Sequence, residues 1–212
     1  MIDPKLEHYL MQTIDQREED IVAIESYATE NHVPIMEPLG IEFLQQMIRI
    51  KQPKRILEIG AAIGYSAIQM AKSYPDCEVV SIERDEQRYN EAVRNINKLG
   101  LENRVHVLFG DAFDLADSLK AKGPFDVLFI DAAKGQYQRF FELFTPELEP
   151  NGMVISDNVL FKGFVADDPD DGSNIAKIAR KIRTYNEWLV QHPDYQTTIV
   201  PVGDGVAISV KK

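Results

Sequence analysis

The sequence has only one cysteine and no long apolar run, and both absences narrow the possibilities. Because Cys77 stands alone, the chain cannot form an internal disulfide, and a thiolate metal site would have too few ligands. No apolar run approaches the roughly 20 residues that span a bilayer. The opening segment, MIDPKLEHYL, has neither the basic region nor the apolar stretch of a signal peptide. We therefore expect a cytoplasmic protein with no membrane partner.

Positive charge is also scarce. Lysine and arginine number 23 against 34 acidic residues, which gives a net charge of −11. Proteins that hold nucleic acid mainly through its phosphates usually have the opposite balance, so the composition argues against broad polyanion binding and leaves only a local basic patch open. The apolar fraction of 44% and the length of 212 residues suffice for one folded domain with a full core.

The first 50 residues lack strand-like patterns and predict helices. We expect helical segments over residues 4–14, 18–32 and 40–51, with Pro34 and Pro38 interrupting the pattern before the third segment. We interpret residues 1–52 as a helical extension and residues 53–212 as an α/β core, both within a single domain.

From residue 55 onward, short apolar runs alternate with amphipathic segments. The runs are RILEIG, EVVSIE, VHVLFG, FDVLFID and GMVISD, and this alternation is typical of a parallel sheet covered by helices on both faces. Two further runs, YQTTIVPV and VAISVKK, flank a Gly-Asp-Gly turn and predict a hairpin. The pattern predicts a seven-stranded, Rossmann-like α/β sheet of the methyltransferase type, mostly parallel, with an antiparallel strand in its C-terminal hairpin.

Glycines and acids follow the first three of these runs. Glu58, Gly60 and Gly64 stand at the end of the first, Glu83 ends the second and Asp111 follows the third. Open α/β sheets bind ligands at the carboxyl ends of their strands, where the strand order reverses. Gly60 allows a tight turn and a close approach to a ligand, while Glu83 is placed for a ribose diol and Asp111 for an adenine amino group.

An NAD-binding fold is the competing interpretation of this edge. Its fingerprint requires G-x-G-x-x-G, whereas the pattern here is E-x-G-x-x-x-G, with Ala62 at the position of the middle glycine. A ligand with adenosine but no pyrophosphate fits better, and S-adenosylmethionine is such a ligand. Glycines that serve only as turns remain the simpler alternative.

The fourth and fifth runs end in Asp131 and in Asp157-Asn158. Neighbouring parallel strands lie roughly 5 Å apart, so these side chains should meet at one edge. Two carboxylates and an amide oxygen are hard ligands of the kind that Mg²⁺ prefers. Lys134, three residues after Asp131, is placed to act as a base on a hydroxyl near such a metal. The alternative is that both aspartates cap the following segments and Lys134 is a solvated surface charge.

Several motifs resemble those of a known family. EIGAAIGYSA, IERD, GDA, FIDAAKGQY and SDNVLFKG are similar to the motifs of the metal-dependent catechol and caffeoyl-CoA type O-methyltransferases, and the similarity covers nearly the whole chain. Within that family, DNVLFKG, HPDYQT and PVGDG resemble the bacterial subgroup that methylates 5-hydroxyuridine at the wobble position of tRNA.

The resemblance implies a site, two cofactors and a second copy of the chain. Catalysis is assigned to Lys134 and Asp131, and Mg²⁺ binding to Asp131, Asp157 and Asn158. The residues implied around S-adenosylmethionine are Met36, Glu58, Gly60, Ser66, Glu83, Asp111, Ala112 and Asp131. The helical extension is implied as a homodimer surface.

The acceptor is left with two candidates. A 5-hydroxyuracil presents a hydroxyl beside a carbonyl, as a catechol presents two hydroxyls, so the metal site alone does not separate a tRNA anticodon loop from a small catechol-like or hydroxycinnamoyl acceptor. Candidate phosphate contacts are Arg139, Lys162, Lys177, Arg180, Lys181 and Arg183. A non-catalytic nucleotide-binding or RNA-binding module and an NAD-dependent oxidoreductase are the rival classes.

An acidic segment over residues 166–174 complicates the tRNA hypothesis. We interpret this segment as a mobile lid, because it lacks apolar anchors. A second cation site is the alternative, with the acids Asp167, Asp168, Asp170 and Asp171 as its ligands.

Overall fold

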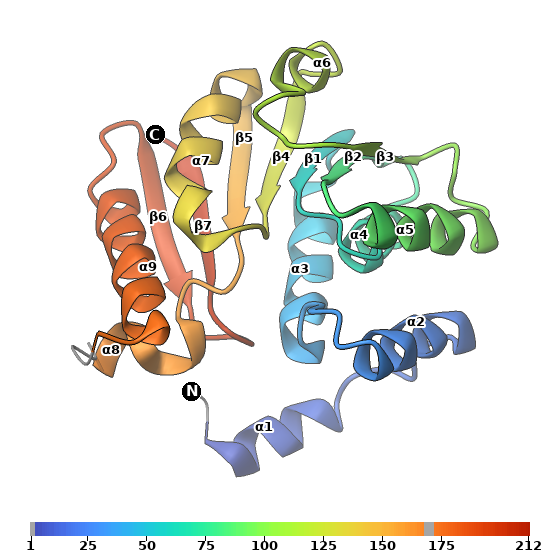
Figure 1. The fold of residues 1–212 in the computed structure, drawn as a ribbon, viewed down its shortest axis with the longest axis horizontal. Coiled ribbons are helices and arrows are strands. Elements are labelled where there is room, and N and C mark those ends of the chain that lie inside the picture. Colours follow the sequence, from blue (N-terminus) through green and yellow to red (C-terminus); the bar gives the residue numbers. More distant parts are fainter. Residues whose placement is uncertain (1–2, 168–171) are drawn as a thin grey trace.

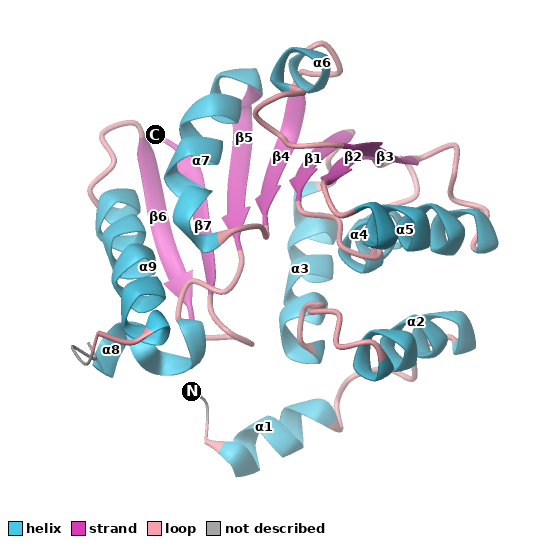
Figure 2. Ribbon diagram, in the orientation of Figure 1, coloured by secondary structure: helices cyan, strands magenta, loops and turns pink. Residues whose placement is uncertain are grey.

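The computed structural model describes residues 3–167 and 172–212, which form a seven-stranded sheet flanked by helices (Figures 1 and 2). The strands are β1 (Arg55–Ile59), β2 (Glu78–Glu83), β3 (Val105–Phe109), β4 (Phe125–Ile130), β5 (Leu148–Ser156), β6 (Tyr195–Val200) and β7 (Val206–Lys211). Their order is β3-β2-β1-β4-β5-β7-β6. β1 to β5 run parallel, while β7 is antiparallel to both β5 and β6. The predicted fold class, including the antiparallel hairpin strand, is confirmed.

The order of the strands creates a ligand crevice. The chain moves from β1 outward through β2 to β3 and then returns to the other side of β1 with β4. Connections that leave neighbouring strands in opposite directions open a space at the carboxyl ends of those strands. The residues that follow β1, β4 and β5 therefore meet there.

The helices form a layer on each face of the sheet. They are α1 (Pro4–Met11), α2 (Glu19–Glu30), α3 (Pro38–Lys51), α4 (Tyr65–Ser73), α5 (Glu86–Lys98), α6 (Ala116–Lys120), α7 (Tyr137–Phe144), α8 (Phe164–Asp167) and α9 (Asn174–Val190), with the 3₁₀ turns η1 (Lys134–Gln136), η2 (Thr145–Glu147) and η3 (Phe161–Gly163). Alternate residues of each strand face opposite sides. Ile56 thus joins a core with α2, α3 and α4, whereas Leu57 joins a core with α7 and α9.

The N-terminal helices differ in how firmly they attach. α3 buries Ile41, Leu44 and Ile48 in the core of its face, and Pro38 begins this helix instead of interrupting it, since proline fits the first turn. α1 buries none of its residues and lies apart from the sheet (Figure 1). Among residues 3–167 and 172–212, no helix has the length and apolar character needed to cross a bilayer.

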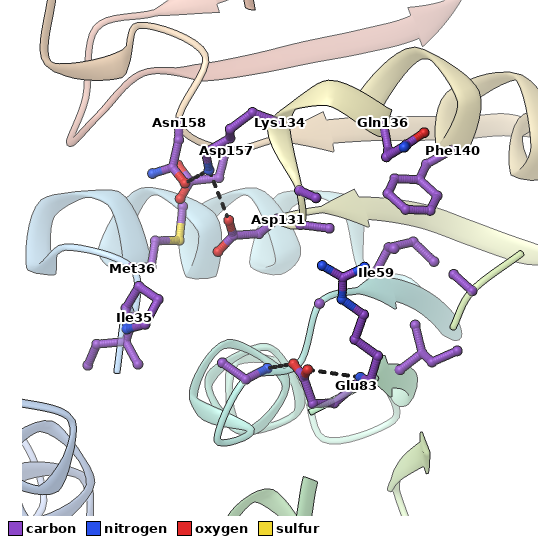
Figure 3. Close-up of a pocket in the computed structure, with 18 of the residues that line it drawn as sticks. Ile35, Met36, Ile59, Glu83, Asp131, Lys134, Gln136, Phe140, Asp157 and Asn158 are labelled. Carbon is purple, nitrogen blue, oxygen red and sulfur yellow. Dashed lines mark hydrogen bonds and ion pairs between the residues drawn. The ribbon is translucent and has the colours of Figure 1, made fainter. Parts of the chain in front are cut away.

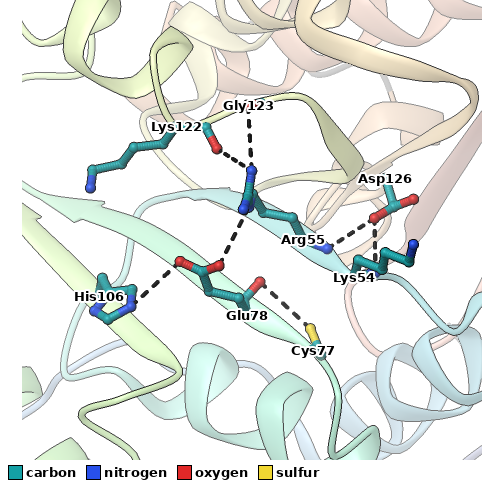
Figure 4. A network of polar contacts seen from close by, with 8 residues as sticks. All are labelled: Lys54, Arg55, Cys77, Glu78, His106, Lys122, Gly123 and Asp126. Atoms are coloured by element: carbon teal, nitrogen blue, oxygen red, sulfur yellow. Dashed lines mark hydrogen bonds and ion pairs between the residues drawn. The ribbon is translucent and has the colours of Figure 1, made fainter.

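The amino ends of the strands are joined by satisfied polar contacts (Figure 4). Asp126 accepts hydrogen bonds from the backbone N–H groups of Lys54 and Arg55, at 2.8 and 2.9 Å. Glu78 pairs with Arg55 at 3.4 Å and lies 3.5 Å from His106. These contacts tie β1 to β4 and to the β2–β3 side of the sheet. The polar groups named here therefore satisfy one another.

The acidic segment lies partly outside the described residues. α8 ends at Asp167, whose side chain is exposed, and Ser173 caps α9. Asp168, Asp170 and Asp171 belong to the part that the structure does not describe, so the lid and the second cation site remain predictions.

Candidate active site

A cavity of about 690 Å³ opens at the carboxyl ends of the strands. The predicted site residues that line it are Met36, Gly60, Glu83, Asp111, Ala112, Asp131, Lys134, Asp157 and Asn158. Lys134, Asp157 and Asn158 lie together at one end, and Glu83 lies at the other (Figure 3). The cavity thus joins an oxygen-rich end to an end with the features of a nucleoside site.

The two aspartates follow a directly paired position of the sheet. Ile130 of β4 pairs with Ser156 of β5, so Asp131 and Asp157 leave neighbouring strands at the same level. The Asp157 N–H donates to the Ile130 carbonyl at 3.0 Å, and the Asp131 N–H donates to the Ile59 carbonyl at 3.0 Å. These backbone bonds extend the parallel ladder by one residue and fix where both carboxylates begin.

The oxygen-rich end places two carboxylates close to a single lysine, Lys134. Asp157 is almost fully buried, and its Oδ2 has no hydrogen-bond partner among the described residues. Burial, reinforced by the neighbouring charge of Asp131, raises the pKa of Asp157 well above its ordinary value. Burial also raises the pKa of Asp131, although Lys134 opposes that shift. A buried, unpartnered carboxylate oxygen is a fit for a cation.

The available donors suit a hard metal ion. Within residues 3–167 and 172–212, no group of three histidine, cysteine, aspartate or glutamate side chains is arranged to hold a metal. Asp131, Asp157 and the amide oxygen of Asn158 are instead the donors at this edge. All are oxygens, the ligand type of Mg²⁺ and Ca²⁺ sites, and this set contains none of the nitrogen or sulfur ligands typical of zinc and copper sites.

The segment after β5 has an unusual backbone. Asn158, Phe161, Lys162 and Gly163 all have positive φ, at 55°, 46°, 53° and 86°. Asparagine and glycine tolerate this region, whereas Phe161 and Lys162 adopt it at a cost of about 1 kcal/mol or more. External contacts must therefore hold the segment in place.

The β6–β7 turn supplies those contacts. The backbone carbonyls of Gly205 and Asp204 accept from the N–H groups of Val159 and Leu160, at 3.0 and 2.9 Å. The Asp204 carboxylate accepts from the Lys162 N–H. Gly205 has φ +87°, and a Cβ there would lie 2.3 Å from Leu160. The turn thus clamps the segment whose Phe161 and Lys162 line the cavity.

Lys134 has partners of two kinds. Its Nζ donates to Asn158 Oδ1 and lies 3.7 Å from Asp131 Oδ1. It also donates to the hydroxyl of Tyr137 at 3.1 Å. The predicted surface alternative for this lysine does not fit its position, because its side chain is only 24% exposed and lines the cavity.

The nucleoside end is organised around Glu83. Its Oε2 accepts from the Ala62 N–H, and its Oε1 accepts from the backbone N–H groups of Arg84 and Asp85, each at 2.8 Å. These bonds fix the carboxylate at the cavity wall. Asp111 lies nearby, 3.7 Å from the Arg84 guanidinium, and its Oδ1 accepts from the Phe113 N–H.

The close approach that Gly60 allows is to the protein backbone itself. A Cβ at Gly60 would lie 2.0 Å from the backbone carbonyl oxygen of Asp131, and its φ is +105°. The loop after β1 therefore packs directly on the end of β4. This contact joins the two ends of the cavity.

Glu58 and Ser66 are not among the residues that line the cavity. Both are buried, and Glu58 accepts hydrogen bonds from the hydroxyls of Ser66 and Ser81. Burial raises the pKa of Glu58 to about 7, although both serines oppose that shift. The structure buries both residues beside the cavity and not in its wall, and their place around S-adenosylmethionine remains a prediction. The two side chains brace β1, β2 and α4 beside the cavity.

The basic residues fall into two groups. Arg139 and Lys162 line the cavity, and the Arg139 guanidinium lies 4.1 Å from the centre of the Phe113 ring, which stacks on Phe140. The others, Lys177, Arg180, Lys181 and Arg183, lie on α9 and do not line it. The Lys181 side chain lies against Gly135 of η1, since a Cβ at Gly135 would be 3.3 Å from its Nζ.

Sequence reasoning missed Tyr137, Asp204 and Phe113 as parts of this site. Tyr137 begins an amphipathic helix and looks like a core residue, and Asp204 looks like an ordinary turn aspartate. The motifs FIDAAKGQY and PVGDG contain both residues and were the only signal available.

The fold and the site define a class of protein. A mostly parallel α/β sheet with an antiparallel strand inserted before its last edge strand, and a cavity at the reversal of strand order, is the class I methyltransferase fold. The model of the O-methyltransferase family matches residues 16–212, so the chain belongs to this family.

Individual relatives agree with this assignment. The chain is 29% identical over 217 residues to a catechol O-methyltransferase of Niastella koreensis, covering 98% of this chain and 96% of the relative. It is 30% identical over 215 residues to the caffeoyl-CoA O-methyltransferase of Stellaria longipes, covering 95% and 88%.

Solved structures agree as well. A protein of Staphylococcus aureus that carries the provisional name caffeoyl-CoA O-methyltransferase has a TM-score of 0.91 at 38% identity, covering 99% of this chain and 100% of the other. An O-methyltransferase of Bacillus cereus, solved with S-adenosylhomocysteine (SAH), has a TM-score of 0.85 at 27% identity, covering 98% and 97%.

Proposed function

We propose that this O-methyltransferase transfers the methyl group of S-adenosylmethionine, with the help of Mg²⁺, to the hydroxyl of an acceptor that presents two adjacent oxygens. The observation that supports this proposal is the pair of Asp131, which is partly exposed, and Asp157, which is buried with an unpartnered oxygen, beside Asn158 and Lys134. The SAH bound by the Bacillus cereus structure supports the choice of methyl donor.

The residues of the cavity would have different roles in binding and catalysis. Glu83 would accept hydrogen bonds from the ribose hydroxyls, Asp111 would accept from the adenine amino group, and Met36 would pack on the donor. Asp131, Asp157 and Asn158 would hold Mg²⁺. A bound Mg²⁺ supplies electrostatic stabilisation for the negative charge of the deprotonated acceptor. Lys134 in its neutral form would take the hydroxyl proton at Nζ, after which the acceptor oxygen attacks the methyl carbon and the carbon–sulfur bond breaks.

A small acceptor with a catechol or hydroxycinnamoyl group is the first candidate substrate. The names of the Niastella and Stellaria relatives support this class. Vicinal oxygens on a flat ring suit the oxygen-rich end of the cavity, and the aromatic side chain of Phe161 lines its wall.

A 5-hydroxyuridine at the wobble position of tRNA is the second candidate. The observation that favours it is the pair of cations, Arg139 and Lys162, at the cavity wall, with Lys181 beside η1. These cations offer phosphate contacts although the chain as a whole is acidic.

Two experiments test these proposals. The purified protein is incubated with labelled S-adenosylmethionine and a catechol, with Mg²⁺ or with a chelator, and Mg²⁺-dependent transfer is expected. Transfer that is insensitive to the chelator would exclude the metal. Nucleoside analysis of tRNA from a deletion strain then distinguishes the two candidate acceptors. Loss of 5-methoxyuridine would identify tRNA as the substrate. Retention of 5-methoxyuridine, with no redundant enzyme present, would exclude tRNA as the substrate. The predicted homodimer and the cytoplasmic location remain predictions.

A further inference from the structure

Lys134 has two partners among the proposed metal ligands and one partner outside them. Its Nζ contacts Asn158 Oδ1 and lies 3.7 Å from Asp131 Oδ1. Both oxygens belong to the donors proposed for Mg²⁺. Its third partner, the hydroxyl of Tyr137 at 3.1 Å, has no place in that donor set.

The Tyr137 hydroxyl has a fixed hydrogen-bond direction. It donates its proton to the backbone carbonyl of Asp157 at 3.1 Å. A hydroxyl has only one proton, so towards Lys134 the oxygen can only accept. The Asp157 carbonyl has no proton to donate, so this contact fixes the direction in which the phenol donates.

The ring that bears this hydroxyl is buried and tightly packed. Tyr137 is 1% exposed at the first residue of α7 and meets Tyr185 edge-on, with ring centres 5.4 Å apart. Lys134 lies three residues earlier, in η1. The backbone and the buried ring therefore fix the hydroxyl relative to the lysine, independently of any ligand in the cavity.

We propose that Tyr137 is a positioning residue for Lys134. Asn158 and Asp131 would hold Mg²⁺ and would then be less available to Lys134. The Tyr137 hydroxyl lies outside that donor set and would still accept from Nζ. The chain of hydrogen bonds from Lys134 to Tyr137 and on to the Asp157 carbonyl would keep Nζ beside the hydroxyl of the methyl acceptor. This inference rests on the proposed function of the site.

The same chain of hydrogen bonds also orients the nitrogen. Because Tyr137 only accepts, Lys134 must direct one N–H bond towards it. The remaining positions of Nζ then point away from Tyr137, and the one that takes the hydroxyl proton is held in a fixed direction. Without the tyrosine hydroxyl, rotation about the Cε–Nζ bond would no longer be restricted, and Nζ would seldom be aligned with the hydroxyl of the methyl acceptor.

Tyr185 provides a matched control. It is also buried, at 3% exposed, and its hydroxyl bonds to that of Ser156 at 2.8 Å, one residue before Asp157. Tyr137→Phe and Tyr185→Phe each remove one buried hydroxyl. With the catechol assay, we expect Tyr137→Phe to lower kcat about tenfold and to leave the KM for S-adenosylmethionine and the Kd for Mg²⁺ within about twofold. Tyr185→Phe should keep kcat within about twofold, with a similar melting temperature.

A second measurement does not depend on turnover. Lysine-selective ¹⁵N NMR of the Mg²⁺-loaded protein should contain one Nζ signal with slow hydrogen exchange that is missing from Lys134→Met. We expect that signal to disappear in Tyr137→Phe and to persist in Tyr185→Phe. Persistence in Tyr137→Phe, or equal kcat values for the two tyrosine variants, would overturn the positioning role. If the signal behaves as expected but no acceptor is methylated, the positioning role stands and the proposed function fails.

Discussion

The backbone carbonyl of Asp131 occupies the space in which a side chain at Gly60 would stand, because a Cβ there would lie 2.0 Å from the carbonyl oxygen. The loop of the nucleoside end therefore rests on the strand end that begins the oxygen-rich end. Methyl transfer requires donor and acceptor to be held at a fixed separation. This glycine contact sets part of that separation.

Gly60→Ala should destabilise the protein and disrupt the donor site. Backbone strain at φ +105° and overlap with Asp131 together cost roughly 3 kcal/mol or more. Gly100→Ala is the control, since Gly100 also has positive φ, at +65°, but nothing lies within 4 Å of its Cβ position. We expect a loss of about 1 kcal/mol there. Urea unfolding measures both, and equal losses would contradict the importance of the contact.

Asp157→Asn should abolish Mg²⁺ binding and methyl transfer while raising the stability of the metal-free protein. The carboxylate is buried with an unpartnered oxygen, so removing its charge relieves a cost of about 1 kcal/mol or more. Asp126→Asn is the control, because that carboxylate accepts two backbone hydrogen bonds and its loss should destabilise by about 1 kcal/mol. Thermal melts with a chelator measure the direction of each stability change, and calorimetry with Mg²⁺ measures the loss of metal binding. A lower melting temperature for Asp157→Asn would contradict this account.

Glu58 should make the stability of the metal-free protein fall as pH rises. Its pKa is raised from 4.5 to about 7, so between these values the unfolded chain releases the proton while the folded protein keeps it. The contribution is fully present below pH 4.5 and is lost by about pH 7, and it amounts to about 3 kcal/mol.

Glu58→Gln isolates this effect. The amide can still bond the two serines but does not titrate, so the stability difference between wild type and variant should change across this pH window. Urea unfolding at several pH values measures the difference. A constant difference would show that folding does not shift the pKa of Glu58.

Asp204→Ala should weaken binding of the acceptor and spare that of the donor. The variant loses the acceptor of the Lys162 N–H, and the left-handed segment over residues 161–163 then relaxes. We expect the KM for the acceptor to rise about tenfold, the value of one such hydrogen bond. Asp204→Asn keeps an acceptor oxygen and should recover most of the loss. Failure of that rescue would point to the charge of Asp204 rather than its hydrogen bond.

Local patterns predicted the architecture well. Apolar runs separated by amphipathic segments require a parallel sheet with two helical layers, because alternate strand residues such as Ile56 and Leu57 must both be buried. Asp131 and Asp157 could be placed at one edge for the same reason, since neighbouring parallel strands end at the same level. The beginning of α3 at Pro38 was the clearest local error, because proline both breaks a helix and starts one.

The sequence by itself determined the sheet, its ligand edge and the chemical type of the groups that gather there. Only the tertiary structure decided which of these groups face the cavity and which brace its wall. Glu58 turned towards Ser66 and Ser81, and Tyr137 towards Lys134 and the Asp157 carbonyl. Periodicity assigns a residue to a face of its own element, whereas the direction of a buried hydrogen bond depends on elements that meet only when the chain is packed.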